Sequence, residues 1–260
     1  MNFEIPFIPE RARKPRESGL TMMMDKGLSL QEAENFCNSS AEFTDLVKFG
    51  FGTALITKEL GQKIKLYREA GLDPYFGGTL FEMFAVRNLL DDYERFTDKF
   101  DIRTVEVSDG SMKIDPEEKV KMIERFAKNK KVLSEVGTKV KGLVIPNADW
   151  VLHMKAELDA GAWKVIAEAR ESGTIGIYNA DGSANRELID DIMKEISVDD
   201  VLWEAPVKAQ QMMFIQMVGA NVNLGNIAPN EVVAMEALRL GMRGDTFFDY
   251  LPEEYQDKRL

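Results

Sequence analysis

The chain is poor in the residues that most often carry catalysis and crosslinks, since its 260 residues include one cysteine and one histidine. The lone Cys37 excludes an internal disulfide, and its place in the helical pattern LQEAENFCN favours a small core residue over a nucleophile. His153 lies inside another helical pattern, WVLHMKAELDAG, where a packing or surface role is expected. Mechanisms that need a histidine base or a histidine-bound zinc are therefore disfavoured.

Long apolar runs and a positive charge balance are also missing. No apolar stretch reaches the roughly 18 residues that span a bilayer, and the N-terminus MNFEIPFIPERARKPR lacks the apolar core of a signal peptide. The net charge of −11 disfavours nucleic acid and anionic membranes as partners. With a single cysteine as well, we expect a cytoplasmic protein.

Short β-branched segments alternate with helical patterns along the chain. The eight strand candidates are GLTMMMDKG, DLVKFGFG, DPYFGG, TVEVSDG, KVLSEVGTK, WKVIAEAR, DVLWEAP and ANVNLGNI. Helix starts are expected at Ser29, Asp115-Pro116 and Pro229-Asn230. This alternation predicts a single (β/α)8 barrel (TIM barrel) over residues 1–260, with an N-terminal arm at 1–18 and a C-terminal tail at 245–260. An open doubly wound sheet is the alternative, but no GxGxxG turn follows the first strand.

Four of these apolar segments each carry one glutamate. The four residues, which we call the glutamate ring, are Glu106, Glu135, Glu168 and Glu204, spaced 29, 33 and 36 residues apart. A buried carboxylate costs several kcal/mol unless a metal, a cation or hydrogen bonds compensate. Four acids at nearly one repeat length therefore suggest that they converge on a common site.

Strand parity places cations and small residues beside these acids, because residues two apart share a face of a strand. The predicted sets are Glu106 with Ser108; Glu135 with Gly137 and Lys139; Glu168 with Arg170; Lys48 with Gly50 and Gly52; and Asn221 with Asn223 and Gly225. They lie in the later halves of the strands, where barrel enzymes build active sites. Asp109 has the opposite parity to Glu106 and ranks lower.

Two interpretations of the charged positions stay open. Layers of lysine and glutamate can neutralise one another inside a barrel and serve packing alone, whereas the adjoining Gly and Asn turns favour a ligand pocket. In a pocket built from carboxylates without histidine, the expected metal is Mg²⁺, and the expected proton donor or base is a lysine. The NVNLGNI turn offers the backbone N–H groups of Gly225 and Asn226 for a phosphate.

Several segments, in order from Lys14 to Phe247, resemble the phosphosulfolactate synthase family. They are KPRESGLTMMMDKG, VKFGFGT, VEVSDGS, SEVGTK, EARESG, WEAP with the following QQ, and NVNLGNI followed by LRLGMRGDTF. The resemblance implies a (β/α)8 barrel, Mg²⁺ dependence and a homo-oligomer such as a trimer. It also implies a lyase-class enzyme that adds sulfite to phosphoenolpyruvate, giving (2R)-phospho-3-sulfolactate for coenzyme M or sulfolactate formation.

The implied reaction suggests roles for the charged residues. Sulfite addition leaves an enolate-like intermediate that needs a proton, for which Lys139 is the first candidate and Lys48 the second, with Glu135 beside them as a catalytic group. The expected Mg²⁺ ligands are Glu106, Glu168 and Glu204, although the sequence leaves open which acids touch the metal. The expected substrate-binding residues are Lys26, Arg170, Asn223, Gly225 and Asn226. Arg16 and Arg243 are expected at the barrel floor in ion pairs or subunit contacts, with Asp245 as a partner.

Two other functions are compatible with the sequence. A strand lysine such as Lys139 or Lys48 is the usual nucleophile of a Schiff-base aldolase. The chain also resembles plant heat-stress-associated proteins of the same family, which suggests a stress or interaction protein with little activity. The full set of buried acids and bases favours an enzyme.

Overall fold

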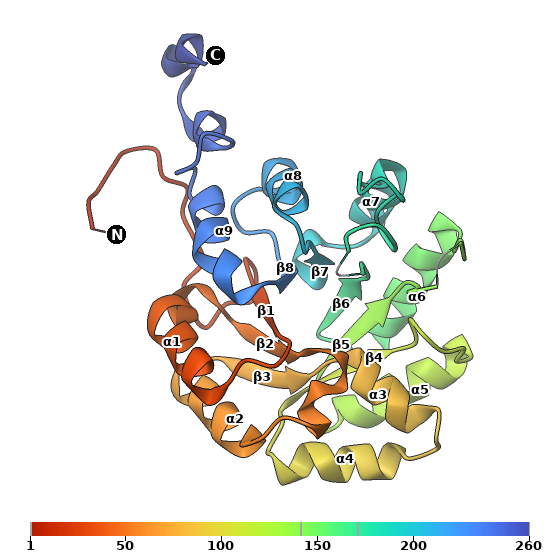
Figure 1. The fold of residues 1–260 in the computed structure, drawn as a ribbon. Coiled ribbons are helices and arrows are strands. Elements are labelled where there is room, and N and C mark those ends of the chain that lie inside the picture. The colour runs from red at the N-terminus through yellow and green to blue at the C-terminus, as the bar shows by residue number, and fades with distance from the viewer. Residues whose placement is uncertain (1, 141, 171, 260) are drawn as a thin grey trace.

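Eight short parallel strands close into a barrel in the computed structural model, which describes residues 2–140, 142–170 and 172–259 (Figure 1). The strands are β1 (Thr21–Asp25), β2 (Leu46–Phe49), β3 (Asp73–Phe76), β4 (Thr104–Ser108), β5 (Lys131–Val136), β6 (Lys164–Ala167), β7 (Val201–Glu204) and β8 (Leu224–Ile227). Each strand pairs with the next along the chain, and β8 pairs with β1. Every strand residue except Asp73 and Lys131 is buried, as expected for a sheet covered on both faces. The predicted (β/α)8 barrel is confirmed.

Helices follow the strands and form the outer layer. They are α1 (Leu30–Ser40), α2 (Leu60–Glu69), α3 (Gly78–Ala85), α4 (Leu90–Lys99), α5 (Pro116–Ala127), α6 (Asn147–Asp159), α7 (Arg186–Glu195), α8 (Lys208–Val218) and α9 (Val232–Arg239). Two expected starts are confirmed: Ser29 caps α1 in a capping box with Glu32, and Asp115 caps α5. At the third, Pro229 opens a short 3-10 turn, η4 (Pro229–Glu231), that leads directly into α9.

The hydrophobic core lies between the barrel wall and the helices. Aromatic rings fill the core between β3 and the helices α3 and α4. There Phe76 of β3 stacks on Phe96 of α4 with ring centroids 5.1 Å apart. The methionines of β1 are buried, and a Cβ added at Gly225 of β8 would lie 2.7 Å from the Met22 methyl, so Met22 faces β8 inside the barrel. The packing leaves the strands' carboxyl ends as the place where polar side chains gather.

The two chain ends leave the barrel on the same side (Figure 1). Arg11 of the N-terminal segment binds Glu236 of α9 at 2.8 Å, and the Phe7 ring lies 5.7 Å from that of Tyr255 in the 3-10 turn η6 (Glu253–Lys258). Nothing long and apolar enough to cross a membrane occurs among the helices in the described ranges.

The basic residues expected at the barrel floor form ion pairs. Arg16 lies 3.4 Å from Asp45, just before β2, and Arg243 lies 3.7 Å from Asp245, as predicted for a structural pair. His153 lies within α6 and Cys37 within α1, so neither borders the strands' carboxyl ends.

Candidate active site

A cavity of about 370 Å³ opens at the carboxyl ends of the strands. Its lining includes residues that follow β2, β3, β5 and β6, as expected for a barrel active site. The lining residues are Met24, Lys48, Gly50, Phe51, Gly77, Gly78, Thr79, Glu106, Glu135, Lys139, Glu168, Ala169, Arg170, Ser172, Glu204 and Asn226. The whole glutamate ring and both candidate lysines therefore share one pocket.

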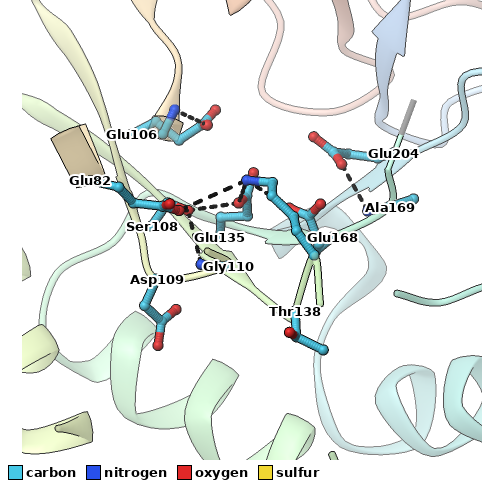
Figure 2. A network of polar contacts seen from close by, with 12 residues as sticks. Glu82, Glu106, Ser108, Asp109, Gly110, Glu135, Thr138, Glu168, Ala169 and Glu204 are labelled. Carbon is cyan, nitrogen blue, oxygen red and sulfur yellow. Dashed lines mark hydrogen bonds and ion pairs between the residues drawn. The ribbon is translucent and has the colours of Figure 1, made fainter. Parts of the chain in front are cut away.

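Three members of the glutamate ring, Glu106, Glu135 and Glu204, surround the ammonium group of Lys48. All four glutamates are at most 1% exposed, and Lys48 is 6% exposed. From Lys48 Nζ the nearest carboxylate oxygen is 2.9 Å away on Glu106, 3.2 Å on Glu204 and 3.5 Å on Glu135. Figure 2 shows the carboxylates facing a common space, whereas the side chain of Asp109 points away from them. Asp109 instead pairs with Lys119 of α5 at 2.8 Å, in agreement with its lower rank.

Lys139 enters the pocket from the turn that follows β5. The turn bends at Gly137, whose φ of 141° favours glycine, and the Lys139 amide donates to the carbonyl of Gly110 at 2.8 Å. Lys139 Nζ lies 2.5 Å from Glu135 and 3.4 Å from Glu168. Its side chain is 20% exposed, so this ammonium reaches both the buried acids and the open side of the pocket.

Burial and the surrounding charges separate the protonation states of these groups. Burial alone would lower the pKa of Lys48, but Glu106 and Glu204 raise it well above the usual value. Lys139 behaves likewise, because Glu135 and Glu168 outweigh burial and raise its pKa. Both lysines therefore carry a proton at neutral pH.

The glutamates of the pocket differ from one another in pKa. Burial, reinforced by the charges of Glu135 and Glu204, raises the pKa of Glu168 well above its usual value. Burial also raises the pKa of Glu204, to about 7. Burial acts in the same direction on Glu135, but Lys139 and Lys48 overcome it and hold its pKa well below the usual range. Burial raises the pKa of Glu106 as well, so the pocket holds one stable carboxylate, Glu135, beside three acids that retain protons more easily.

Three of the four glutamates could hold a metal ion. Ligand oxygens of Glu135, Glu168 and Glu204 lie within 4.8 Å of one another, and we call these residues the acidic triad. Neither oxygen of Glu168 has a hydrogen-bond partner, and neither does Oε2 of Glu135, although these atoms are buried. Buried carboxylate oxygens without partners are costly, and they are the ligands that hard divalent cations prefer. The acidic triad fits such a cation.

Glu106 is bound differently from the triad. Its Oε2 accepts from the Tyr75 hydroxyl at 2.9 Å, and its Oε1 accepts from the backbone N–H of Gly78 and lies against Lys48. A Cβ at Gly78 would lie 2.4 Å from the Cβ of Ser108, so the start of α3 approaches β4 this closely only with glycine. The structure brings Glu106 into the pocket but satisfies its oxygens with protein donors.

Two residues behind the pocket were missed at the level of sequence. The Ser108 hydroxyl lies 2.5 Å from Oε1 of Glu82 and 2.7 Å from Oε1 of Glu135, as Figure 2 shows. Glu82 belongs to α3 and is 5% exposed. A single acid in the apolar helix segment TLFEMFA was the available signal. Tyr75 of β3 was also missed, because an aromatic residue in a strand is usually core.

The predicted substrate-binding residues divide into two groups. Asn226 has a left-handed φ of 58° and lines the pocket, and its Oδ1 has no hydrogen-bond partner. Arg170 also lines the pocket, is exposed, and makes no ion pair with any described residue. Lys26 follows β1 and is exposed at the same end, with its Cγ near Gly50 of the lining.

The remaining two predicted substrate-binding residues, Asn223 and Gly225, lie deeper in the barrel. Asn223 precedes β8 at the amino end of the barrel, where its side chain bonds Leu20, Asp199 and Val201. Gly225 faces Met22 and Leu202 in the barrel interior. Neither borders the pocket, because strand parity specifies the face of a residue and not its height along the barrel axis.

Comparisons with known proteins agree with this geometry. Residues 9–245 match the family model described as (2R)-phospho-3-sulfolactate synthase (ComA). The chain is 39% identical over 244 residues to a phosphosulfolactate synthase of Bacillus subtilis, covering 93% of this chain and 97% of that protein. It is 40% identical over 237 residues to one of Methanocaldococcus jannaschii, covering 89% and 94%. Among solved structures, 3-hexulose-6-phosphate synthase from Salmonella typhimurium matches with a TM-score of 0.53 at 14% identity, over 86% of this chain and 100% of that one, which supports the fold alone.

Proposed function

The chain belongs to the phosphosulfolactate synthase family, and we propose that it adds sulfite to C3 of phosphoenolpyruvate to form (2R)-phospho-3-sulfolactate. One observation carries the proposal beyond the family match. The buried ammonium of Lys48 and the partly exposed ammonium of Lys139 share a pocket with four buried glutamates at the end of the barrel where active sites form. Packing alone does not require Glu168 oxygens that lack hydrogen bonds, or an open cavity beside them.

Lys139 is the proposed proton donor. The sulfur lone pair of sulfite forms the C3–S bond, and the electrons of the C2–C3 double bond move toward C2 and the carboxylate. The C2–H bond then forms as an N–H bond of Lys139 breaks, and water restores the ammonium. Lys139 suits this role because it is protonated and is the more exposed of the two lysines.

Lys48 and Glu135 are proposed to hold the charges in place. Lys48 is enclosed by three carboxylates, so its ammonium stabilises negative charge in the pocket without leaving its position. Glu135 orients the Lys139 ammonium through its 2.5 Å contact. The raised pKa values of both lysines disfavour the neutral amine that a Schiff-base mechanism needs.

A divalent cation is the proposed cofactor, with Mg²⁺ as the ion. The residues that would hold it are the acidic triad, with Glu106 nearby but already bonded by protein donors. When bound, Mg²⁺ would supply Lewis-acid stabilisation of the negative charge that develops on the substrate carboxylate. Four acids against two lysines would otherwise repel a multiply charged anion from the pocket.

Arg170, Asn226 and Lys26 are proposed to bind the anionic ends of the substrates. Arg170 and Asn226 line the pocket and offer an unpaired guanidinium and a side-chain amide among the described residues. Guanidinium groups recognise phosphate and carboxylate through paired hydrogen bonds. Lys26 adds positive charge at the same end of the barrel.

Turnover of the two substrates tests the proposal. We expect consumption of sulfite that requires both phosphoenolpyruvate and Mg²⁺, with phosphosulfolactate detected by phosphorus NMR or mass spectrometry. A sample treated with EDTA and then resupplied with Mg²⁺ should lose and regain activity. Absence of product from the folded, Mg²⁺-loaded protein would refute the assignment and favour a stress or interaction protein.

A further inference from the structure

A second cavity, of about 610 Å³, opens at the amino ends of the strands, at the end of the barrel opposite the candidate active site. We call it the floor pocket. Its lining residues are Lys14, Pro15, Arg16, Leu20, Asp45, Leu46, Arg68, Gly71, Leu72, Asp73, Arg103, Thr104, Lys131 and Trp163. It includes Lys14, Pro15 and Arg16 of the KPRESG motif, for which the proposed reaction has no use.

The floor pocket is basic in an acidic protein. Its lining contains five cationic side chains and two carboxylates, whereas the whole chain carries a net charge of −11. Asp45 is already engaged by Arg16 and by the Thr21 amide, and Asp73 accepts from the Thr104 hydroxyl at 2.6 Å. With Asp101, which lies beside the lining and faces Arg68 and Arg103, three carboxylates meet five cations, so the floor pocket keeps a positive excess.

Two of the cations are held by contacts with the protein, Arg16 with a buried side chain and Lys14 half-buried. The Arg16 side chain is 5% exposed, and its buried Nε makes no hydrogen bond, with Asp45 3.4 Å away. Lys14 Nζ donates to the carbonyls of Ala41 and Thr44. Burial lowers the pKa of Lys14 below its usual value. The charge of Asp45 opposes this effect, and that of the adjacent Arg16 adds to it. Both ammonium and guanidinium groups are thus held at the pocket before any ligand arrives.

The rim carries more exposed cations, Arg103 and Lys131, together with the ring of Trp163. Lys131 Nζ lies 3.8 Å from the centroid of the Trp163 ring, a cation–π contact. Arg68 and Arg103 both face the single carboxylate of Asp101, at 3.4 and 3.5 Å. The buried leucines Leu20, Leu46 and Leu72 supply the apolar part of the lining.

We propose that the floor pocket is a binding site for a small, multiply charged anion with a compact apolar body, such as a phosphate ester or a polycarboxylate. Its volume lies in the range of small-molecule sites. Its charge pattern, with less exposed cations inside and more exposed ones at the rim, suits two or more anionic groups. The site is separate from the substrate pocket, because the two cavities lie at opposite ends of the same strands.

Trp163 reports on this site directly. The other two tryptophans, Trp150 and Trp203, are 3% and 0% exposed and lie outside the floor pocket lining. Inorganic pyrophosphate is the probe, titrated at constant ionic strength with NaCl as the control. We expect a saturable change in tryptophan emission that disappears in Trp163→Phe.

A rim variant tests the cations without disturbing the fold. Arg103 is 74% exposed and Lys131 is exposed, so the double variant Arg103→Ser/Lys131→Ser should fold and keep the proposed turnover within about twofold. We expect pyrophosphate to bind it at least about tenfold more weakly, which is the effect of losing about 1.4 kcal/mol. Arg170→Ser, at the other end of the barrel, should leave the Trp163 response unchanged.

Three results would overturn the inference. The first is an absence of any saturable Trp163 response in the wild-type protein. The second is an equal response in the rim variant. The third is a combination of two observations: the wild-type protein does not bind pyrophosphate, and the rim variant has a different molecular mass in light scattering. That combination would identify the floor pocket as a subunit contact.

Discussion

Lys139 Nζ lies 2.5 Å from Oε1 of Glu135, four residues earlier in the chain, and both residues line the pocket at the end of β5. The pair spans the last strand residue, Val136, and the sharp turn at Gly137. A cation and an acid from one short segment thereby set the position of the proposed proton donor. Glu135 also accepts a hydrogen bond from the Ser108 hydroxyl and lies 3.5 Å from Lys48, so its carboxylate contacts three polar neighbours.

Removing the Lys139 ammonium should stop protonation more than binding. For Lys139→Met we expect kcat to fall by about 10²- to 10⁴-fold, the usual contribution of a positioned proton donor. KM for phosphoenolpyruvate should change less, because Lys48 and Arg170 remain. Steady-state kinetics of sulfite consumption give both constants. Lys121→Met, at an exposed position on α5, is the control, and a wild-type kcat in Lys139→Met would exclude Lys139 as the donor.

The acidic triad should control metal affinity, whereas Glu106 should matter less. Mn²⁺ is a suitable spectroscopic probe because it takes the same oxygen ligands as Mg²⁺. We expect Glu168→Gln to weaken Mn²⁺ binding by at least about tenfold. Glu106→Gln should have a smaller effect, because Tyr75 and Gly78 already occupy its oxygens. Electron paramagnetic resonance titration measures free Mn²⁺, and the reverse order of effects would assign Glu106 as a ligand in place of Glu168.

Much of the site followed from the sequence because strand alternation is local. A lone acid in each β-branched segment was enough to place Glu106 and Glu204 inside the barrel, since both lie within strands. Lys139 and Arg170 were harder cases, because β5 ends at Val136 and β6 at Ala167, before either residue. Both still line the pocket, because the turns after these strands point toward the barrel axis.

Height along the barrel and contacts from helices did not follow from the sequence. Asn223 and Gly225 share the predicted face of β8 but lie below the pocket, since nothing in a local pattern specifies depth. Glu82 reaches Ser108 from α3, a contact across 26 residues that depends on how closely the helix packs. Arg16 was expected in an ion pair, but the cavity around it is built from the starts of six strands, β1 to β6, and no single segment could predict it.

Without metal, the raised pKa of Glu204 should make the protein less stable as pH rises. A carboxyl group that titrates near 7 when folded, and near 4.3 when unfolded, binds its proton more tightly in the folded state. Its contribution to the free energy of unfolding is therefore present below about pH 4 and is lost as pH rises to about 7, by up to about 4 kcal/mol. Urea unfolding in EDTA at pH 5 and pH 8 measures the change. Glu204→Gln should reduce this pH dependence, and an identical slope in the variant would contradict the prediction.

The close approach of α3 to β4 should make Gly78 intolerant of a side chain. A methyl group there would lie 2.4 Å from Ser108 Cβ and 2.8 Å from Glu106 Oε1, so the helix start must move away from the pocket. For Gly78→Ala we expect a loss of about 1–3 kcal/mol in the free energy of unfolding, together with a fall in kcat, since Glu106 loses the Gly78 amide. Gly61→Ala in α2 is the matched control, because its methyl would meet only the Phe100 ring at 3.8 Å. That variant should gain about 0.5–1 kcal/mol by removing a helical glycine. Denaturant unfolding and turnover of both variants decide the matter, and equal stability of the two would show that α3 can shift without cost.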